Sequence, residues 1–240
     1  MDKAISLNQP KVIAAIPCYN EEHFIGEVVL SAKKYVDQVV VIDDGSHDGT
    51  SQVAIDAGAL IVKHNVNKGY GESLKSCFEA AKANGAEIVV ILDGDNQHSP
   101  HQIPALLAPI LKHEADLTIG SRFLDKGGRN IPRYRKFGIH IITWLFNAGS
   151  EIKLTDAQSG FRAYSTRIFD NISFTEKGMG ISIEILIKAI GKGFTIQEVP
   201  ITCAYHPGSS TQNPVRHGLG VALAVVKFRL KYLLKPRGDS

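Results

Sequence analysis

The chain has 240 residues, of which 44% are hydrophobic and 21% are charged, and its formal net charge is +3. This composition excludes an intrinsically disordered chain and is sufficient for one large α/β domain with a sizeable core. The charge is too small to indicate a nucleic-acid partner, and the three widely spaced cysteines form neither a disulfide framework nor a zinc motif, which predicts a reducing cytoplasmic compartment.

The first half of the chain alternates short apolar runs with segments of helical spacing. Predicted strands cover residues 11–16, 38–42, 60–63, 88–92 and 116–120, and predicted helices cover residues 24–35, 50–57, 71–84 and 100–113. The run 88–92 is unbroken, apolar and mostly β-branched, which is typical of a strand buried on both faces. This alternation predicts an α/β fold, with a Rossmann-like, mostly parallel sheet and helices on both faces.

The second half is less regular. We predict a basic, glycine-rich loop at 124–135, an apolar helix at 137–146, a loop leading into a strand at 155–165, a helix at 181–191, a strand at 195–203 and a final helix at 218–234. No run reaches the roughly 18 apolar residues of a membrane span, and no signal peptide is predicted. One domain is expected over residues 1–212. The segment 213–240 is expected to form an amphipathic helix that lies in a membrane interface or packs on protein.

Polar residues follow three of the predicted strands. They are Pro17, Tyr19 and Glu21 after the first strand, Asp43 and Asp44 after the second, and Asp93, Asp95 and Gln97 after the fourth. The carboxyl ends of parallel strands meet at one sheet edge, where open α/β sheets bind ligands. Carboxylate and amide oxygens are suited to magnesium or manganese bound with phosphates. Ordinary turns and helix caps are the alternative for each residue taken alone.

Two further segments carry groups that suit a phosphate. The loop 67–71 contains Lys68 and Gly71 before a predicted helix, so its N–H groups and lysine would reach a phosphate. Arg122 follows the fifth strand, where it would meet a diphosphate. The alternative for the loop is that its glycines only allow the chain to turn. The alternative for Arg122 is that it is an ordinary surface charge.

Together these motifs resemble those of the inverting family 2 glycosyltransferases with a GT-A fold. The matching segments are 17–21, 43–50 (Asp-Asp-Gly-Ser-His-Asp-Gly-Thr), 67–71, 93–98 (Asp-Gly-Asp-Asn-Gln-His) and 120–122. Residues 156–164 (Asp-Ala-Gln-Ser-Gly-Phe-Arg-Ala-Tyr) and 198–201 resemble the polyprenyl-phosphate branch, the dolichol-phosphate mannose or glucose synthases. The segment 206–211 departs from that branch, because an expected arginine and lysine are missing. The donor is therefore left open between GDP-mannose and a UDP-sugar.

The resemblance implies a role for each matching residue. The nucleoside and its phosphates would be held by Pro17, Tyr19, Glu21, Asp43, Asp44, Lys68, Gly71 and Gly94. Asp93 would lie at the ribose and the metal, Asp95 and Gln97 would ligate magnesium or manganese, and Arg122 would reach the diphosphate. Arg162, with Arg133 and Arg135 of the basic loop, would face the acceptor, and Asp93, Asp95, Arg122 and Arg162 would form the catalytic set.

The predicted reaction is transfer of a hexose from a nucleotide diphosphate sugar to a polyprenyl (dolichyl) phosphate at the cytoplasmic membrane face. The acceptor phosphate is already anionic and needs no side-chain base. One alternative is a sugar-hydroxyl acceptor, for which Asp156 or Glu184 would be the base. The others are a sugar nucleotidyltransferase and an inactive nucleotide-binding subunit. No nucleic-acid partner is expected, and the oligomeric state stays open.

Overall fold

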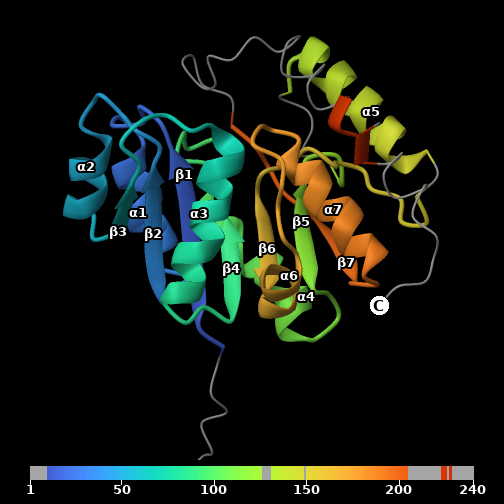
Figure 1. The fold of residues 1–240 in the computed structure, drawn as a ribbon, viewed down its shortest axis with the longest axis horizontal. Coiled ribbons are helices and arrows are strands. Elements are labelled where there is room, and N and C mark those ends of the chain that lie inside the picture. The colour runs from blue at the N-terminus through green and yellow to red at the C-terminus, as the bar shows by residue number, and fades with distance from the viewer. Residues whose placement is uncertain (1–9, 126–130, 149, 205–222, 226, 229–240) are drawn as a thin grey trace, which may run out of the picture.

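The computed structural model describes residues 10–125, 131–148, 150–204, 223–225 and 227–228. Within them, seven strands form one mixed sheet in the order β3-β2-β1-β4-β6-β5-β7 (Figure 1). The strands are β1 (Val12–Cys18), β2 (Gln38–Asp43), β3 (Leu60–Lys63), β4 (Ile88–Ile91), β5 (Leu117–Ser121), β6 (Arg162–Ser165) and β7 (Ile196–Pro200). All neighbouring pairs are parallel except those of β6, so the predicted mostly parallel sheet is confirmed.

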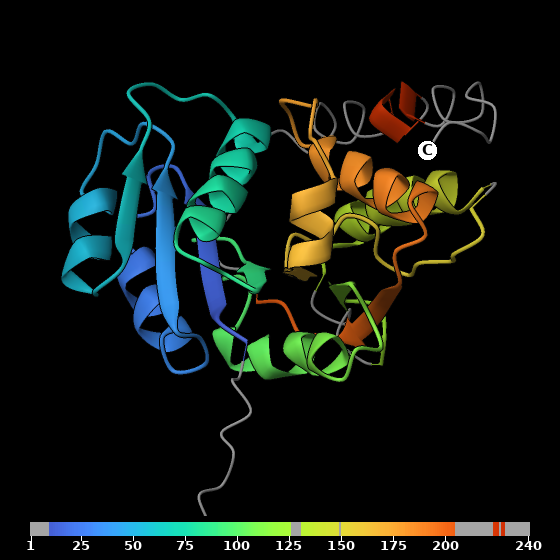
Figure 2. The same cartoon turned by 60° about the horizontal axis from the view of Figure 1, so that its bottom comes forward.

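Helices cover both faces of this sheet, as predicted. They are α1 (Ile25–Ala32), α2 (Thr50–Asp56), α3 (Tyr70–Ala83), α4 (Ile103–Leu111, preceded by the 3₁₀ turn Pro100–Gln102), α5 (Arg133–Asn147), α6 (Thr166–Asn171) and α7 (Ile181–Gly191). One buried cluster joins the sheet to α1, α2 and α4, and a second joins its other face to α3, α5, α6 and α7. Figure 2 shows the sheet between these two layers.

The central strand β4 shows why the sheet is buried on both sides. Its residues Ile88 and Val90 belong to the cluster beneath α1 and α4, whereas Val89 and Ile91 belong to the cluster beneath α3 and α7. All four side chains are at most 3% exposed. Because successive residues point to opposite faces, a continuous apolar run is what such a strand requires.

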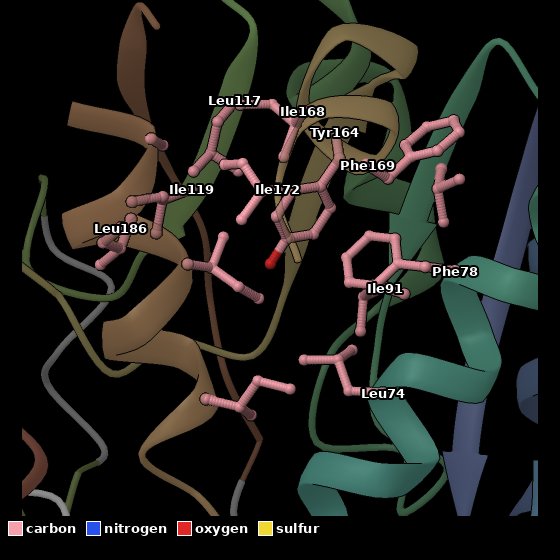
Figure 3. Close-up of a cluster of buried hydrophobic side chains, with 14 of the residues drawn as sticks. Leu74, Phe78, Ile91, Leu117, Ile119, Tyr164, Ile168, Phe169, Ile172 and Leu186 are labelled. Atoms are coloured by element: carbon pink, nitrogen blue, oxygen red, sulfur yellow. The ribbon is translucent and has the colours of Figure 1, made fainter. Parts of the chain in front are cut away.

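Strand β6 runs antiparallel between β4 and β5. Its Tyr164 packs edge-on against Phe78 of α3, with ring centroids 5.0 Å apart, inside the apolar cluster drawn in Figure 3. The short helix α6, which was not predicted, follows directly and adds Ile168 and Phe169 to this cluster. The strand inserted here keeps the segment before it, residues 156–161, against the carboxyl end of β4.

The end of the chain is described only in part, and most of the predicted helix lies outside the described residues. Residues 223–225 and 227–228 are helical. Ala224, Val225 and Phe228 are at most 5% exposed and belong to the core, and Lys227 pairs with Glu176 at 3.0 Å. This part of the segment therefore packs on the protein, which was one of the two predicted alternatives. No helix in the described part of the chain is long and apolar enough to span a membrane.

Candidate active site

The acidic pair Asp93 and Asp95 lies just past the carboxyl end of β4. Between them stands Gly94, whose backbone is packed so closely against β1 that an added Cβ would come 2.4 Å from the Sγ atom of Cys18. A side chain at this position would have to displace the buried end of β1. Gly94 is thus explained by close packing, and it holds the two carboxylates at the predicted edge of the sheet.

Three carboxylates in this region have raised pKa values. Burial, followed by the charges of Asp95 and Asp93, raises the pKa of Glu21 to about 7. Burial raises the pKa of Asp93 to about 6, and burial together with the charge of Asp93 raises that of Asp95. These shifts show that negative charge is costly here, and a bound cation would relieve the cost.

The donor set is suited to a small divalent ion that keeps substrate and water ligands. No group of three His, Cys, Asp or Glu side chains in the described segments is arranged to hold a metal. Magnesium commonly uses one or two carboxylates together with substrate phosphates, so Asp93 and Asp95 fit such an ion. Gln97, the third predicted metal ligand, contacts Asp95. Its Nε2 donates to Oδ2 of Asp95 at 2.6 Å, and its Oε1 faces the Sγ of Cys203 at 3.9 Å. Gln97 therefore orients Asp95, and its role as a metal ligand stays a prediction.

A cavity of about 70 Å³ opens beside Asp93. Its lining comes from the start of α3, the loop before β6 and the start of α7, and consists of Tyr70, Asp93, Ala157, Gln158, Gly160, Met179, Ser182 and Ile183. The sequence prediction missed Tyr70, Gln158, Met179 and Ser182, although Tyr70 and Gln158 lie inside motifs that it used.

His98 is a further residue that the predictions omitted. Its ring stacks on Phe161 with centroids 5.2 Å apart, and its Nδ1 lies 3.5 Å from Oδ2 of Asp93. Burial, followed by the charge of Arg122, lowers the pKa of His98 to about 4. The ring is therefore neutral at physiological pH and forms an uncharged wall beside Asp93.

Arg122 lies close enough to act on this site electrostatically. Its positive charge lowers the pKa values of both Asp93 and His98, although burial has the larger effect on each. Its guanidinium also forms a bidentate ion pair with the fully buried Asp156, with Nε–Oδ2 at 2.6 Å and Nη2–Oδ1 at 2.8 Å. Asp156 is fixed in turn by Glu198, which accepts its backbone N–H at 2.8 Å. Arg122 is thus held in place by a buried carboxylate.

The prediction that Arg162 contacts the acceptor is wrong for this structure. Arg162 is 1% exposed and lies on β6 inside the fold. Its guanidinium donates to the carbonyl oxygens of Ser159, Ser182 and Ala157 at 2.7, 3.0 and 2.8 Å. Ala157 and Ser182 line the cavity, so Arg162 supports two of its walls from behind.

The two aspartates at the carboxyl end of β2, Asp43 and Asp44, accept hydrogen bonds from protein groups. Asp43 is fully buried and accepts hydrogen bonds from the N–H of Ser46, at 2.8 Å, and from the hydroxyl of Ser51. Asp44 is 4% exposed and accepts the N–H groups of Lys68 and Gly69 at 2.9 and 2.8 Å. The structure thus uses both carboxylates to shape the loops around the predicted nucleoside site.

Four other predicted donor-site residues differ in their exposure to solvent and therefore in whether they can contact a ligand. Tyr19 is 42% exposed and the side chain of Lys68 is also exposed, so both can meet a ligand. Pro17 is buried within β1. Gly71 donates its N–H to the carbonyl of Lys177 at 3.0 Å, and an added Cβ would lie 2.4 Å from the carbonyl carbon of Lys177. The backbone N–H of Gly71, which was predicted to contact phosphate, is therefore used in the contact with the loop that contains Lys177.

The predicted acceptor residues Arg133 and Arg135 lie on the first turn of α5, because this helix begins at Arg133 instead of residue 137. None of the residues that line the cavity lies on α5. In Figure 1, α5 lies at the end of the molecule opposite α2. The structure therefore separates these arginines from the cavity lining and places them on an outer helix.

Comparison with solved structures identifies the fold. The chain is similar to glucosyl-3-phosphoglycerate synthase from Mycobacterium tuberculosis in a crystal structure with Mn²⁺, uridine diphosphate and phosphoglyceric acid. The TM-score is 0.71 at 24% sequence identity, over 96% of this chain and 80% of that chain. The fold is the GT-A fold of glycosyltransferases.

The sequence itself defines the family. The model of glycosyl transferase family 2 matches residues 13–173, and the chain belongs to this family of enzymes. It is 30% identical to the UDP-N-acetylglucosamine–dolichyl-phosphate N-acetylglucosaminyltransferase of Methanococcus voltae, over 92% of this chain and 94% of that protein. It is 31% identical to the polyprenol monophosphomannose synthase of Mycolicibacterium smegmatis, over 80% of this chain and 77% of that protein.

Proposed function

We propose that this enzyme transfers a hexose or a related sugar from a nucleotide diphosphate sugar to a polyprenyl phosphate, with magnesium or manganese as cofactor and with inversion at the anomeric carbon. The two relatives described above are named for transfer to dolichyl phosphate or for synthesis of a polyprenol phosphate sugar, which supports this acceptor class. Their names differ in the sugar, so the donor is proposed only as a GDP- or UDP-linked sugar.

The observation that carries the acceptor proposal is the burial of both candidate bases. A sugar-hydroxyl acceptor requires a general base within reach of its proton. Asp156 is fully buried and is bound to Arg122, and Glu184 is fully buried and pairs with Lys188 at 2.7 Å. Glu184 also accepts the backbone N–H groups of Thr175 and Glu176 at 2.9 and 2.7 Å. A phosphate acceptor is already anionic and needs neither of them.

The side chains beside the cavity have distinct roles in this reaction. Asp93 and Asp95 would hold the divalent ion, and Gln97 orients Asp95 through its 2.6 Å hydrogen bond. The ion would supply positive charge at the donor diphosphate. Arg122, fixed by Asp156, would add positive charge on the same side as the leaving group, where negative charge increases in the transition state. Tyr19, exposed at the end of β1, would cover the base.

The acceptor is proposed to approach along α5. Tyr134, Phe137, Ile141 and Trp144 are 59, 68, 42 and 67% exposed, and their 3–4–3 spacing puts them on one face of the helix. The first turn carries Arg133, Arg135 and Lys136, and α5 contains no acidic residue. A basic turn followed by an exposed aromatic stripe suits an anionic lipid surface. We therefore propose that the enzyme is peripheral, bound through α5 to the cytoplasmic face of a membrane.

The assay that tests this function measures release of nucleoside diphosphate. The enzyme is incubated with each of several GDP- and UDP-sugars, with manganese, and with or without a short-chain polyprenyl phosphate. We expect release with one class of donor, and only when both the metal and the lipid phosphate are present. Undiminished transfer in excess chelator would refute the proposed cofactor. Release of pyrophosphate from a nucleoside triphosphate and a sugar phosphate would instead identify a nucleotidyltransferase.

A further inference from the structure

A buried chain of hydrogen bonds joins two strand ends to α3, away from the residues that line the cavity. It runs from Asp44, which directly follows β2, through His64, which directly follows β3, to Ser76 on α3. His64 Nδ1 lies 2.6 Å from Oδ1 of Asp44, and His64 Nε2 lies 2.9 Å from Oγ of Ser76. Asp44 and His64 are 4 and 5% exposed.

The chemistry of the carboxylate fixes the first link of this chain. A carboxylate can only accept, so Nδ1 of His64 carries the proton that is donated to Asp44. The second link joins Nε2 of His64 to the hydroxyl of Ser76, which can donate or accept. Each link orients the next, from the serine through the imidazole to the carboxylate.

Asp44 also forms hydrogen bonds with the loop between β3 and α3. Its Oδ1 also accepts the N–H of Lys68 at 2.9 Å, and its Oδ2 accepts the N–H of Gly69 at 2.8 Å. Gly69 has φ of +89°, and the next residue, Tyr70, begins α3 and lines the cavity. The orientation of the Asp44 carboxylate therefore sets where the loop turns into the helix.

We propose that His64 and Ser76 are positioning residues. They hold Asp44 in the orientation that closes the loop 65–69 and places Lys68 and Tyr70 at the donor site. The proposal rests on the proposed function, in which that site binds a nucleotide diphosphate sugar. The same three residue types form hydrolytic triads. Here, however, Ser76 lies in the second turn of α3, where backbone N–H groups are used within the helix and cannot serve as an oxyanion hole.

Three substitutions separate the links of the chain. His64→Asn keeps an N–H close to the position of Nδ1, so the contact with Asp44 survives. His64→Gln places its amide nearer the position of Nε2, and that contact is lost. Ser76→Ala removes only the outermost link and is the variant that disturbs packing least. Ser31→Ala, on α1, is the matched control for a helix serine outside the chain.

The first measurement is hydrogen exchange of the peptide that spans residues 64–70, which needs no catalytic activity. Freeing a buried carboxylate from one partner costs enough to speed local opening by about tenfold or more. We expect the fastest exchange at the amides of Lys68 and Gly69 in His64→Gln, a smaller increase in both Ser76→Ala and His64→Asn, which lose the link to Ser76 but keep the contact with Asp44, and parental exchange in Ser31→Ala. Equal exchange in His64→Gln and the parent would overturn the proposal.

The second measurement is steady-state transfer together with calorimetry of UDP and GDP in the presence of manganese. His64→Gln should raise the KM for the donor about tenfold with kcat changed less than about threefold, and His64→Asn should restore KM. A fall in kcat at constant KM, or a failure of His64→Asn to restore KM, would overturn the positioning role. If the parent transfers no sugar, the proposed function fails, whereas the exchange measurement still decides whether the chain holds the loop.

Discussion

Replacing Arg162 by alanine should destabilise the fold instead of weakening acceptor binding. The guanidinium is almost fully buried and donates to three carbonyl oxygens, those of Ser159, Ser182 and Ala157. Hydrogen bonds to charged groups contribute about 1.5–3 kcal/mol each. The desolvation of a buried cation opposes part of that gain, so we expect a net loss of about 4 kcal/mol.

Urea denaturation followed by circular dichroism measures this loss, and a thermal scan gives a second value. A chain of this size loses about 2–4 °C of midpoint per kcal/mol, so Arg162→Ala should melt roughly 8–16 °C below the parent. Arg167→Ala is the matched control. Arg167 follows β6, its side chain is 69% exposed, and it pairs with Asp116 at 2.8 Å. An exposed ion pair of this kind contributes less than about 1 kcal/mol.

Two results would refute the reasoning on Arg162. One is a loss of stability no larger than that of the Arg167→Ala control. The other is a variant that keeps the parental midpoint but needs more lipid phosphate for half-maximal rate. The second result would mean that Arg162 leaves its three carbonyls and reaches the acceptor, as the sequence motif had suggested.

Three further predictions concern the acidic site and the outer helix. Asp95→Ala should abolish transfer and also the rise in melting temperature that manganese gives with a nucleotide, and a retained metal effect would contradict its role. The pKa of Glu21 rises from 4.5 to about 7 on folding, so the unfolded state binds fewer protons between these values and stability falls as pH rises through them. Glu21→Gln should therefore raise the melting temperature at pH 8 and have little effect at pH 4, and an equal change at both pH values would contradict the shift. The double variant Phe137→Ser/Trp144→Ser should lose sedimentation with anionic vesicles while its melting temperature changes little, because both side chains are more than 60% exposed. Parental sedimentation would argue against docking through α5.

The sheet and the position of the acidic pair were predictable because they follow from local pattern. The β-branched apolar run Ile88–Ile91 is typical of a strand buried on both faces, and a parallel sheet brings its carboxyl end beside that of β1. Asp93 and Asp95 were predicted correctly to lie there. Burial and the charges of Asp95 and Asp93 raise the pKa of Glu21, which lies in a distant segment of the sequence, and only the sheet topology brings the three carboxylates together.

The contacts of Arg122 and Arg162 could not be predicted from the sequence. Arginines are usually exposed, so a functional contact was the natural prediction for Arg162. Its burial depends on an antiparallel strand between β4 and β5, and a four-residue strand carries no signal of its direction. The ion pair of Arg122 with Asp156 spans 34 residues, and the same chain of contacts removes Asp156 as a candidate base.

The predicted start of α5 was wrong because it was based on local sequence propensity. The glycines and arginines of 124–135 favour a loop, yet the helix starts at Arg133 directly after Pro132, whose fixed φ suits the position before a first turn. Three basic residues in that turn oppose the helix dipole. Anionic lipid headgroups in front of the turn would offset this cost, which agrees with the proposed docking of α5 on a membrane.

The most direct test of the central claim compares two lipid acceptors that differ by one group. The enzyme is given its best nucleotide sugar and manganese, with either a short-chain polyprenyl phosphate or the corresponding polyprenol, and the lipid products are identified by mass spectrometry. We predict a phosphate-linked glycolipid from the first acceptor and no glycolipid from the second, because a phosphate is already anionic, whereas the candidate bases Asp156 and Glu184 are both held in buried ion pairs. Glycosylation of the polyprenol at a comparable rate, or of neither lipid while a free sugar is glycosylated, would contradict the account.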